Sequence, residues 1–364
     1  MSQSSLQMFA KILSTLLVLM YAFVPYILDS LKIYQIPWAV ENFYYSVVLA
    51  VIIMFLPHYS FKKHLFRFDV HSNSLTKTIV LFFVCCLVFS LWSWHDDRES
   101  VGASVAAFFR ALWILNSFCF IKSTEKKRTW LILLTAILVF IDQSRTYFMI
   151  SFMVLALASN RKKLYLVIGM FGVLLVAAVR VGESMSIIGM LTYGIVGEGY
   201  NGSKAVGQVL LLNRDSVDWL SHTALTLLQP IYLPIEMVVG PFFDAGLPTQ
   251  SSILGNAVKV ELGEKLSPMG GWYILADFIW YGPIGIVLMF IYINMTWYLS
   301  NFILNTRYFP IGAFFFFLSI KAMPFVYYKM LTYVVGIAFV FTLLGFYKNK
   351  NFKFRPVKIG NLTF

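Results

Sequence analysis

The chain has 364 residues, of which 59% are hydrophobic and only 13% are charged, and its formal net charge is +12. Charged residues make up about a quarter of an ordinary soluble domain, so this composition excludes a soluble globular protein and predicts an integral membrane protein. The sequence has no Cys-x-x-Cys or His-x-x-x-His spacing, no Gly-rich phosphate loop and no Gly-x-Ser-x-Gly elbow. We therefore expect neither a metal site nor a cofactor.

Continuous apolar runs recur along the chain, each long enough to cross the hydrocarbon core of a bilayer, which needs about 20 residues of helix. The runs do not alternate between apolar and polar residues, which predicts helices rather than barrel strands. We expect an all-α polytopic membrane protein with about ten transmembrane helices. The expected spans are residues 8–29, 36–57, 75–94, 101–121, 129–141, 146–159, 164–181, 271–298, 308–322 and 326–346.

Lysine and arginine gather in alternate loops, which predicts the orientation, because positively charged loops stay in the cytoplasm. Basic clusters follow the second, fourth and sixth spans, and a further basic cluster follows the last span. Both termini are therefore expected in the cytoplasm, and the net charge indicates topology and affinity for anionic lipid rather than nucleic-acid binding. The predicted organisation is an N-terminal bundle of about seven helices at 1–181, a long periplasmic loop at 182–270, C-terminal helices at 271–346 and a basic cytoplasmic tail at 347–364.

The central segment 182–270 holds eight of the 17 acidic residues and no clean membrane span, so we expect a functional site there. Its apolar patch at 225–243 contains three prolines, which favours a re-entrant or interfacial helix over a full crossing. Broken helices of this kind commonly line polar cavities. The run that starts at Gly271 contains Tyr281-Gly282-Pro283, where we expect a kink.

Three arginines, Arg145, Arg180 and Arg214, are expected at the same outward face. The planar guanidinium suits phosphate oxygens, and pairing with nearby acidic residues is the alternative. His222 is the histidine of the central segment. It is a candidate catalytic base, and the alternative is an interfacial polar residue.

A family resemblance rests on two stretches and their layout. Ser144 and Arg145 lie in "DQSRTY" after a short outward turn, a long external loop follows, and then comes "SPMGGWYILADFIWYGPIGIVL". This arrangement resembles the Wzy-type O-antigen and polysaccharide repeat-unit polymerases, over most of the chain in layout and in these two stretches in detail.

The resemblance implies a metal-independent enzyme of the bacterial inner membrane, related to the GT-C glycosyltransferases and facing the periplasm. Such an enzyme transfers a growing glycan from undecaprenyl diphosphate onto a lipid-linked repeat unit, in the biosynthesis of lipopolysaccharide or another polysaccharide. The implied partners are the undecaprenyl-diphosphate-linked oligosaccharide, membrane lipids, a flippase and a chain-length regulator.

For this reaction the three arginines are candidates to stabilise the diphosphate leaving group. A general base near the acceptor hydroxyl is expected among Glu198, Asp215, Asp218 and His222. Candidates for substrate binding come from the family-like stretches and from aromatic or basic residues of the loop. They are Ser144, Tyr200, Lys204, Lys265, Ser267, Asp277 and Tyr281. For the residues of the second stretch, close helix packing is the alternative role.

Two other functions stay open. An O-antigen ligase is the nearest enzyme, although the residues after His222 do not match the local pattern of the ligase histidine. The loop also contains only Arg214, with Arg180 at its edge, whereas some polymerases have Arg-rich loops, so the donor site is open too. A flippase or another transporter would share the many spans and broken helices, but the two halves of the chain show no convincing repeat.

Overall fold

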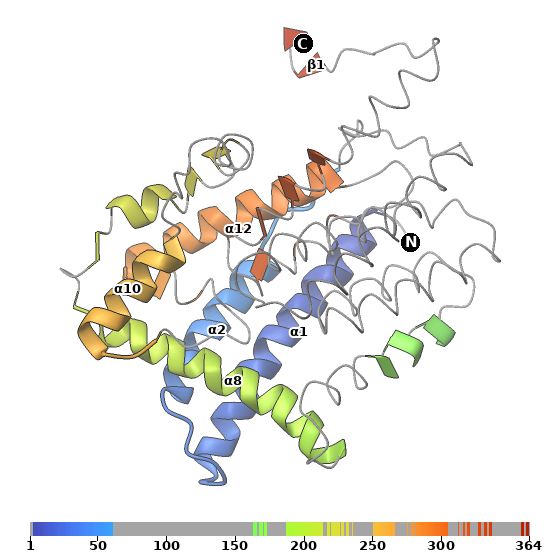
Figure 1. The fold of residues 1–364 in the computed structure, drawn as a ribbon. Helices are drawn as coiled ribbons and strands as arrows, with labels where there is room; N and C mark the ends of the chain where they lie inside the picture. Colours follow the sequence, from blue (N-terminus) through green and yellow to red (C-terminus); the bar gives the residue numbers. More distant parts are fainter. Residues whose placement is uncertain are drawn as a thin grey trace, which may run out of the picture. The chain divides into compact units, whose positions relative to one another are not determined.

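The computed structural model describes residues 3–60, 163–172, 187–235, 250–265, 275–304, 312–336 and 358–363, several of these ranges with gaps. The chain divides into two compact units, and the first comprises Met1–Ser60, Met170–Asn301 and Gly312–Lys329. The described helices are α1 (Gln3–Ser30), α2 (Ala39–Met54), α8 (Ile187–Leu211), α10 (Gln250–Leu262) and α12 (Pro283–Leu304), shown in Figure 1. In the second unit, β1 (Lys358–Ile359) pairs antiparallel with β2 (Leu362–Thr363).

Two of these helices have the length and apolarity of membrane spans, namely α1 over Gln7–Ser30 and α12 over Pro283–Phe302. α2 is also apolar but shorter. The first two predicted runs are therefore confirmed as helices. The predicted spans 75–94, 101–121, 129–141 and 146–159 lie outside the described residues, and the described positions of 164–181, 308–322 and 326–346 are helical. The full number of spans stays a prediction.

The polarity of α1 is opposite to that of a helix in a soluble protein. Its buried face carries Gln7, Lys11 and Ser14, whereas its exposed face carries large apolar side chains such as Leu16 and Phe23. A soluble amphipathic helix buries its apolar face and exposes its polar one. α12 repeats the inverted pattern: Thr296, Ser300 and Asn301 are buried, and Ile284, Val287, Phe290 and Ile291 are exposed. This distribution suits helices surrounded by hydrocarbon, where polar residues face the bundle interior.

The start of α1, the end of α2 and the last part of α12 meet in one polar layer. The Gln7 side chain donates to the Tyr59 carbonyl at 2.8 Å and accepts from the Tyr59 N–H at 3.1 Å. The buried Lys11 ammonium donates to the carbonyl of Leu56 and lies 5.9 Å from the centroid of the Trp297 ring. These contacts bring together the ends that alternating membrane crossings would place on the same side.

Helix α8 lies across the other end of α1 and α2 (Figure 1) and contacts both. Small residues at intervals of four allow this close approach. A Cβ added at Gly199 would come within 2.2 Å of a proline side chain of α1, and one at Gly207 within 2.0 Å of Trp38 Cδ1. Between them, the Ser203 hydroxyl accepts a hydrogen bond from Asn42 Nδ2 at 3.1 Å.

Trp38, which contacts α8, has a left-handed backbone with φ 62° and ψ 23° and stands immediately before α2. This conformation is unusual for a bulky residue and persists only when the surrounding structure holds it. The preceding turn is closed by a hydrogen bond of 2.8 Å from the Ile36 N–H to the Asp29 carboxylate. The close approach of α8 at Gly207 therefore involves a residue whose backbone conformation the surrounding structure must hold.

Candidate functional site

The second half of α8 packs against α10, and this contact positions the residues of the candidate site. Ala205 and Val209 of α8 and Leu254 and Val258 of α10 are completely buried in one apolar cluster. The side chain of Tyr281, just before α12, packs against the same cluster. The central segment therefore contains two packed helices, α8 and α10, and it contacts Tyr281 just before α12.

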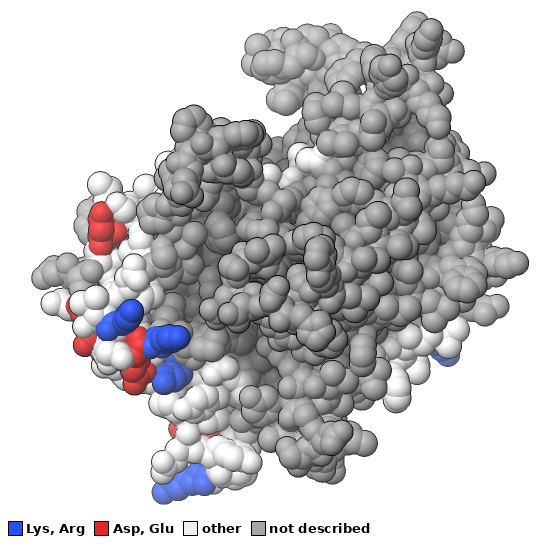
Figure 2. Space-filling model, viewed as in Figure 1, with Lys and Arg blue, Asp and Glu red and all other residues white. Residues whose placement is uncertain are grey.

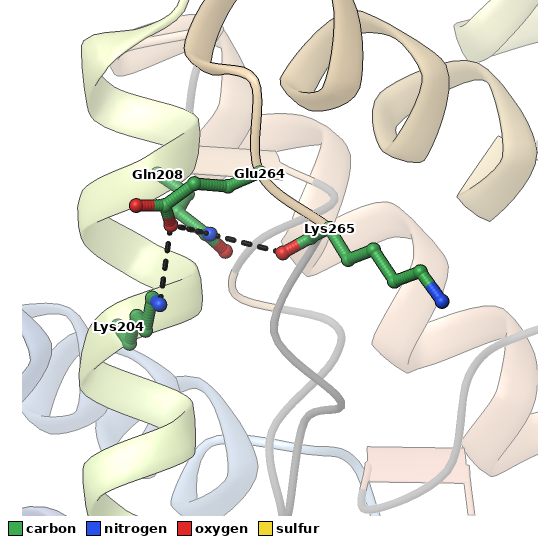
Figure 3. Close-up of polar contacts among 4 residues, drawn as sticks. All are labelled: Lys204, Gln208, Glu264 and Lys265. Atoms are coloured by element: carbon green, nitrogen blue, oxygen red, sulfur yellow. Dashed lines mark hydrogen bonds and ion pairs between the residues drawn. The ribbon is translucent and has the colours of Figure 1, made fainter.

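Polar side chains of α8 and of the residues after α10 form an ion pair and hydrogen bonds beside the α8–α10 contact (Figure 3). Lys204 Nζ lies 3.1 Å from Glu264 Oε2, and Gln208, one turn further along α8, donates to the same oxygen at 2.8 Å. Gln208 also donates to the Lys265 carbonyl at 3.1 Å. The pKa of Glu264 is below its ordinary value, because the hydrogen bond from Gln208 and then the Lys204 ammonium stabilise the carboxylate.

The surface around this junction mixes both signs of charge, as Figure 2 shows. Lys259, Glu261 and Glu264 are exposed there, and Glu261 accepts a hydrogen bond of 2.8 Å from the Asn213 N–H. The side chain of Lys265 points away from α8 (Figure 3). Lys204 is thus engaged in an ion pair, and substrate binding by either predicted lysine stays a prediction.

The structure brings together two of the predicted site residues, His222 and Tyr281. The His222 side chain is fully buried, and its Nδ1 lies 2.6 Å from the Tyr281 hydroxyl oxygen. Thr223 donates to the same hydroxyl, also at 2.6 Å. A histidine of the central segment therefore meets the family-like stretch in a partly buried network that can hold or move a proton.

Asp218 begins the helical stretch that carries His222. Its carboxylate accepts hydrogen bonds from the Ser221 N–H at 3.2 Å and the Ser221 hydroxyl at 2.5 Å, and its carbonyl accepts from the His222 N–H at 2.9 Å. This is the geometry of an N-cap. The hydrogen bonds from Ser221 lower the pKa of the Asp218 carboxyl. Asp218 positions the backbone of His222, and its predicted role as a base stays a prediction.

The expected interruption at Tyr281-Gly282-Pro283 is present, and it is a turn between two helical stretches. Gly282 has φ 63°, a left-handed conformation that glycine adopts without strain. Its N–H donates to the Ile279 carbonyl at 2.9 Å. Pro283 then opens α12, where its missing N–H is not needed. The predicted run 271–298 therefore yields a helix of spanning length that begins only at Pro283 and continues to Leu304.

The helical stretch after Asp218 has an exposed apolar face. The described positions of 220–235 are helical, and Leu220, Leu228, Ile231 and Ile235 are between 52% and 64% exposed. His222 is on the buried side. The interfacial or re-entrant helix expected near 225–243 stays a prediction, but its described part has the apolar surface that such a helix needs.

The remaining predicted site residues are not brought together by the described structure. Tyr200 lies on α8 and is 39% exposed. Glu198 belongs to α8, but its side chain is outside the described residues, as are seven further candidates: Ser144, Arg145, Arg180, Arg214, Asp215, Ser267 and Asp277. The arginine clamp for a diphosphate stays a prediction.

Three contact residues were not predicted. Thr223 follows His222 directly, and Gln208 follows Lys204 by four residues, so both could have been inferred from their helical neighbours. Trp38 carries no such signal, because its contact with α8 joins distant parts of the chain. Within the described ranges, no group of three or more His, Cys, Asp or Glu is placed to hold a metal ion.

Comparison with known proteins finds no relative of this chain. The chain matches no protein-family model, no curated protein and no solved structure. In the part of the chain that the structure describes, the molecule is mainly helical, two of its helices suit a membrane, and the buried His222 contacts Tyr281.

Proposed function

We propose that the protein is a membrane glycosyltransferase that polymerises lipid-linked repeat units at the periplasmic face of the bacterial inner membrane. The observation that carries this proposal is the contact of 2.6 Å between His222 and Tyr281. It joins the central acidic segment to the stretch that resembles repeat-unit polymerases. A buried imidazole beside the cluster of α8 and α10 is a suitable starting point for group transfer at a sugar hydroxyl.

The membrane location is supported by the inverted polarity of α1 and α12. Their exposed faces are apolar and their buried faces carry amide, hydroxyl and ammonium groups. In water such faces would form large apolar patches, which soluble proteins rarely leave uncovered. In a bilayer the same faces would contact acyl chains.

The two ends of α12 support the proposed side of the membrane. Tyr281 precedes the first residue of α12, whereas Trp297 lies in the polar layer with Lys11. With 22 residues, α12 is about 33 Å long, which is close to the thickness of the hydrocarbon core. If the N-terminus is cytoplasmic, as the basic loops predict, His222 and Tyr281 belong to the periplasmic end.

In the proposed reaction the hydroxyl of the acceptor sugar attacks the anomeric carbon of the donor glycan. The bond from this carbon to the lipid diphosphate breaks, and a general base takes the hydroxyl proton. The departing diphosphate gains negative charge, which Arg145, Arg180 and Arg214 would stabilise in the absence of a metal. The exposed Tyr200 on α8 would offer a ring face to the sugars.

The proposal is tested by the electrophoretic profile of surface glycan from cells that lack the gene. Polymerase function predicts loss of the ladder, with single repeat units still attached to the lipid core. Complementation with the wild-type gene and with Tyr34→Phe, an exposed residue of the α1–α2 turn, should restore the ladder, and His222→Asn should not.

Three other results would contradict the proposal. An unchanged electrophoretic profile of the surface glycan would contradict polymerase function. Elongated chains that remain on the carrier lipid would indicate a ligase. Loss of all surface glycan with precursor retained inside the cell would indicate a transporter.

A further inference from the structure

Buried contacts differ between the two ends of the first unit. One end carries the polar layer around Lys11 and Trp297, and the other carries His222 and Tyr281. We propose that the end with the polar layer stays closed throughout the reaction, so that lipid-linked glycan enters and leaves only at the end of His222 and Tyr281. This inference rests on the proposed function, because it describes how the substrate reaches the site.

Side chains of α1 and α12 hold the short segment after α2 from two sides. Carbonyl groups of this segment accept hydrogen bonds from Lys11 and Gln7 of α1 and from Trp297 of α12. Gln7 also contacts α12 directly, since its Nε2 donates to Asn301 Oδ1 at 3.2 Å. Three parts of the chain are therefore joined by hydrogen bonds in one layer.

The polar contacts continue from α12 to the helical positions of 312–329. Tyr327 contacts the Ser300 hydroxyl and donates to the Thr296 carbonyl at 3.3 Å. The Ser319 hydroxyl donates to Thr296 Oγ1 at 3.5 Å. Separation of these helices in hydrocarbon would leave the polar groups without partners, which is costly. A fourth part of the chain is thus bound to the same end of α12.

Bulky aromatic side chains fill the space around this end of α12. Among the largest fully buried side chains are Trp297, Tyr292, Tyr327, Tyr328 and Phe316. The rings of Trp297 and Phe316 meet edge to face with their centroids 4.9 Å apart, and the ring centroids of Tyr327 and Tyr328 lie 5.0 Å apart. Packing of this density leaves the helices little room to separate.

The other end must open for His222 to act. Its side chain is fully buried, so a sugar hydroxyl or a phosphate oxygen can reach the imidazole only after neighbouring segments move. Glycines contribute close contacts and a turn at this end, namely Gly199, Gly207 and Gly282. Glycine changes its backbone conformation at little steric cost. Movement is therefore expected at this end, whereas a transporter with alternating access would have to open at both ends in turn.

A cross-link at the closed end tests the proposal through activity. The ring centroids of Tyr59 and Tyr298 lie 5.2 Å apart. In full-length protein without its three native cysteines, Tyr59→Cys and Tyr298→Cys would be joined by a short bismaleimide. Elongation of lipid-linked repeat units, extracted from cells that lack the gene, should run at the same rate before and after cross-linking. Loss of elongation, while each single-cysteine variant treated with the reagent stays active, would overturn the proposal.

Spin labels test the closed end without relying on activity. Met8 of α1 and Tyr298 of α12 are 41% and 40% exposed, so labels on Met8→Cys and Tyr298→Cys leave the buried contacts in place. Electron paramagnetic resonance in lipid nanodiscs should give one distance between the labels, with and without the extracted repeat units. A second, longer distance in the presence of the repeat units would overturn the proposal.

Hydrogen exchange of the unmodified protein provides a measurement that needs no variant. The Tyr59 N–H donates to Gln7 Oε1 at 3.1 Å, and it should stay equally protected with and without the repeat units. Faster exchange of this N–H in the presence of the repeat units would contradict a closed end.

The two kinds of measurement separate this inference from the proposed function. If the wild-type protein makes no ladder, the proposed function fails, and the spin-label distance still shows whether this end opens. If the ladder forms but the longer distance appears, the proposed function stands and the closed end is wrong.

Discussion

Gly207→Ala tests whether α8 packs closely against Trp38, in the turn between α1 and α2. The added Cβ would lie 2.0 Å from Trp38 Cδ1 and 2.3 Å from Cγ and Nε1, where real Cβ contacts stay above 3.0 Å. Either the indole or α8 must move by about 1 Å or more to restore ordinary packing. Trp38 has a left-handed backbone at the start of α2, a conformation that the surrounding structure must hold, so a shift of its backbone is an unfavourable way to relieve the contact.

The expected magnitude follows from two opposing effects. Replacing glycine by alanine inside a helix stabilises it by about 0.5–1 kcal/mol, whereas overpacking typically costs about 1–3 kcal/mol. Gly202, on the same helix, has nothing within 4 Å of an added Cβ, so Gly202→Ala has only the first effect. The free energies of unfolding of the two variants should therefore differ by about 1–3 kcal/mol.

The assay is the thermal unfolding of each purified full-length variant in detergent, followed by circular dichroism. The unfolding midpoint of Gly202→Ala should equal or exceed that of the wild type, and that of Gly207→Ala should be lower. In a Trp38→Ala background, Gly207→Ala should no longer destabilise, because the two side chains are coupled. Equal unfolding midpoints for Gly207→Ala and Gly202→Ala would contradict close packing of α8 against Trp38.

Three further predictions concern the junctions and the topology. Because the pKa of Glu264 is lowered in the folded protein, its contribution to stability is complete above the ordinary carboxyl pKa of 4.5 and is lost as the pH falls through the lowered value. Hydrogen exchange should therefore show that Glu264→Gln weakens the α8–α10 junction at neutral pH and not in strong acid; an equal difference at both would contradict this. Lys11→Met should destabilise by about 1–3 kcal/mol, because the Leu56 carbonyl loses its donor, and an unfolding midpoint at or above that of the wild type would argue against this role. A reporter fused after Phe364 should be cytoplasmic and one near Gly246 external; a cytoplasmic result at Gly246 would make 225–243 a true span.

The apolar helices could be predicted from the sequence, but α8 and α10 could not. α1 and α2 are continuous apolar runs, and the turn before α12 is marked by Gly282 and Pro283. α8 contains several glycines, which lower helix propensity. The same glycines provide the close contact with α1 and Trp38, so packing outweighs propensity in α8. The segment that the sequence predicts to be a long loop therefore contains the helices α8 and α10.

For the candidate site, residue types were easier to predict than contacts. His222 and Tyr281 could each be named from the sequence, but the hydrogen bond between them joins positions 59 residues apart. Nothing in the local pattern predicts that bond or the part played by Thr223. Lys204 was a candidate for substrate binding, whereas its partner in the structure is Glu264, a distant residue of the same segment. Long-range pairing of this kind depends on how α8 meets α10.

Chain elongation by the purified protein in liposomes tests the central claim most directly. The liposomes would contain lipid-linked repeat units accessible to the face that carries His222, and the products would be separated by electrophoresis. Polymerisation predicts a ladder of lengthened lipid-linked glycans with the wild-type protein and with Tyr34→Phe, and none with His222→Asn. Movement of unlengthened repeat units across the bilayer, with no ladder from the wild-type protein, would contradict the account.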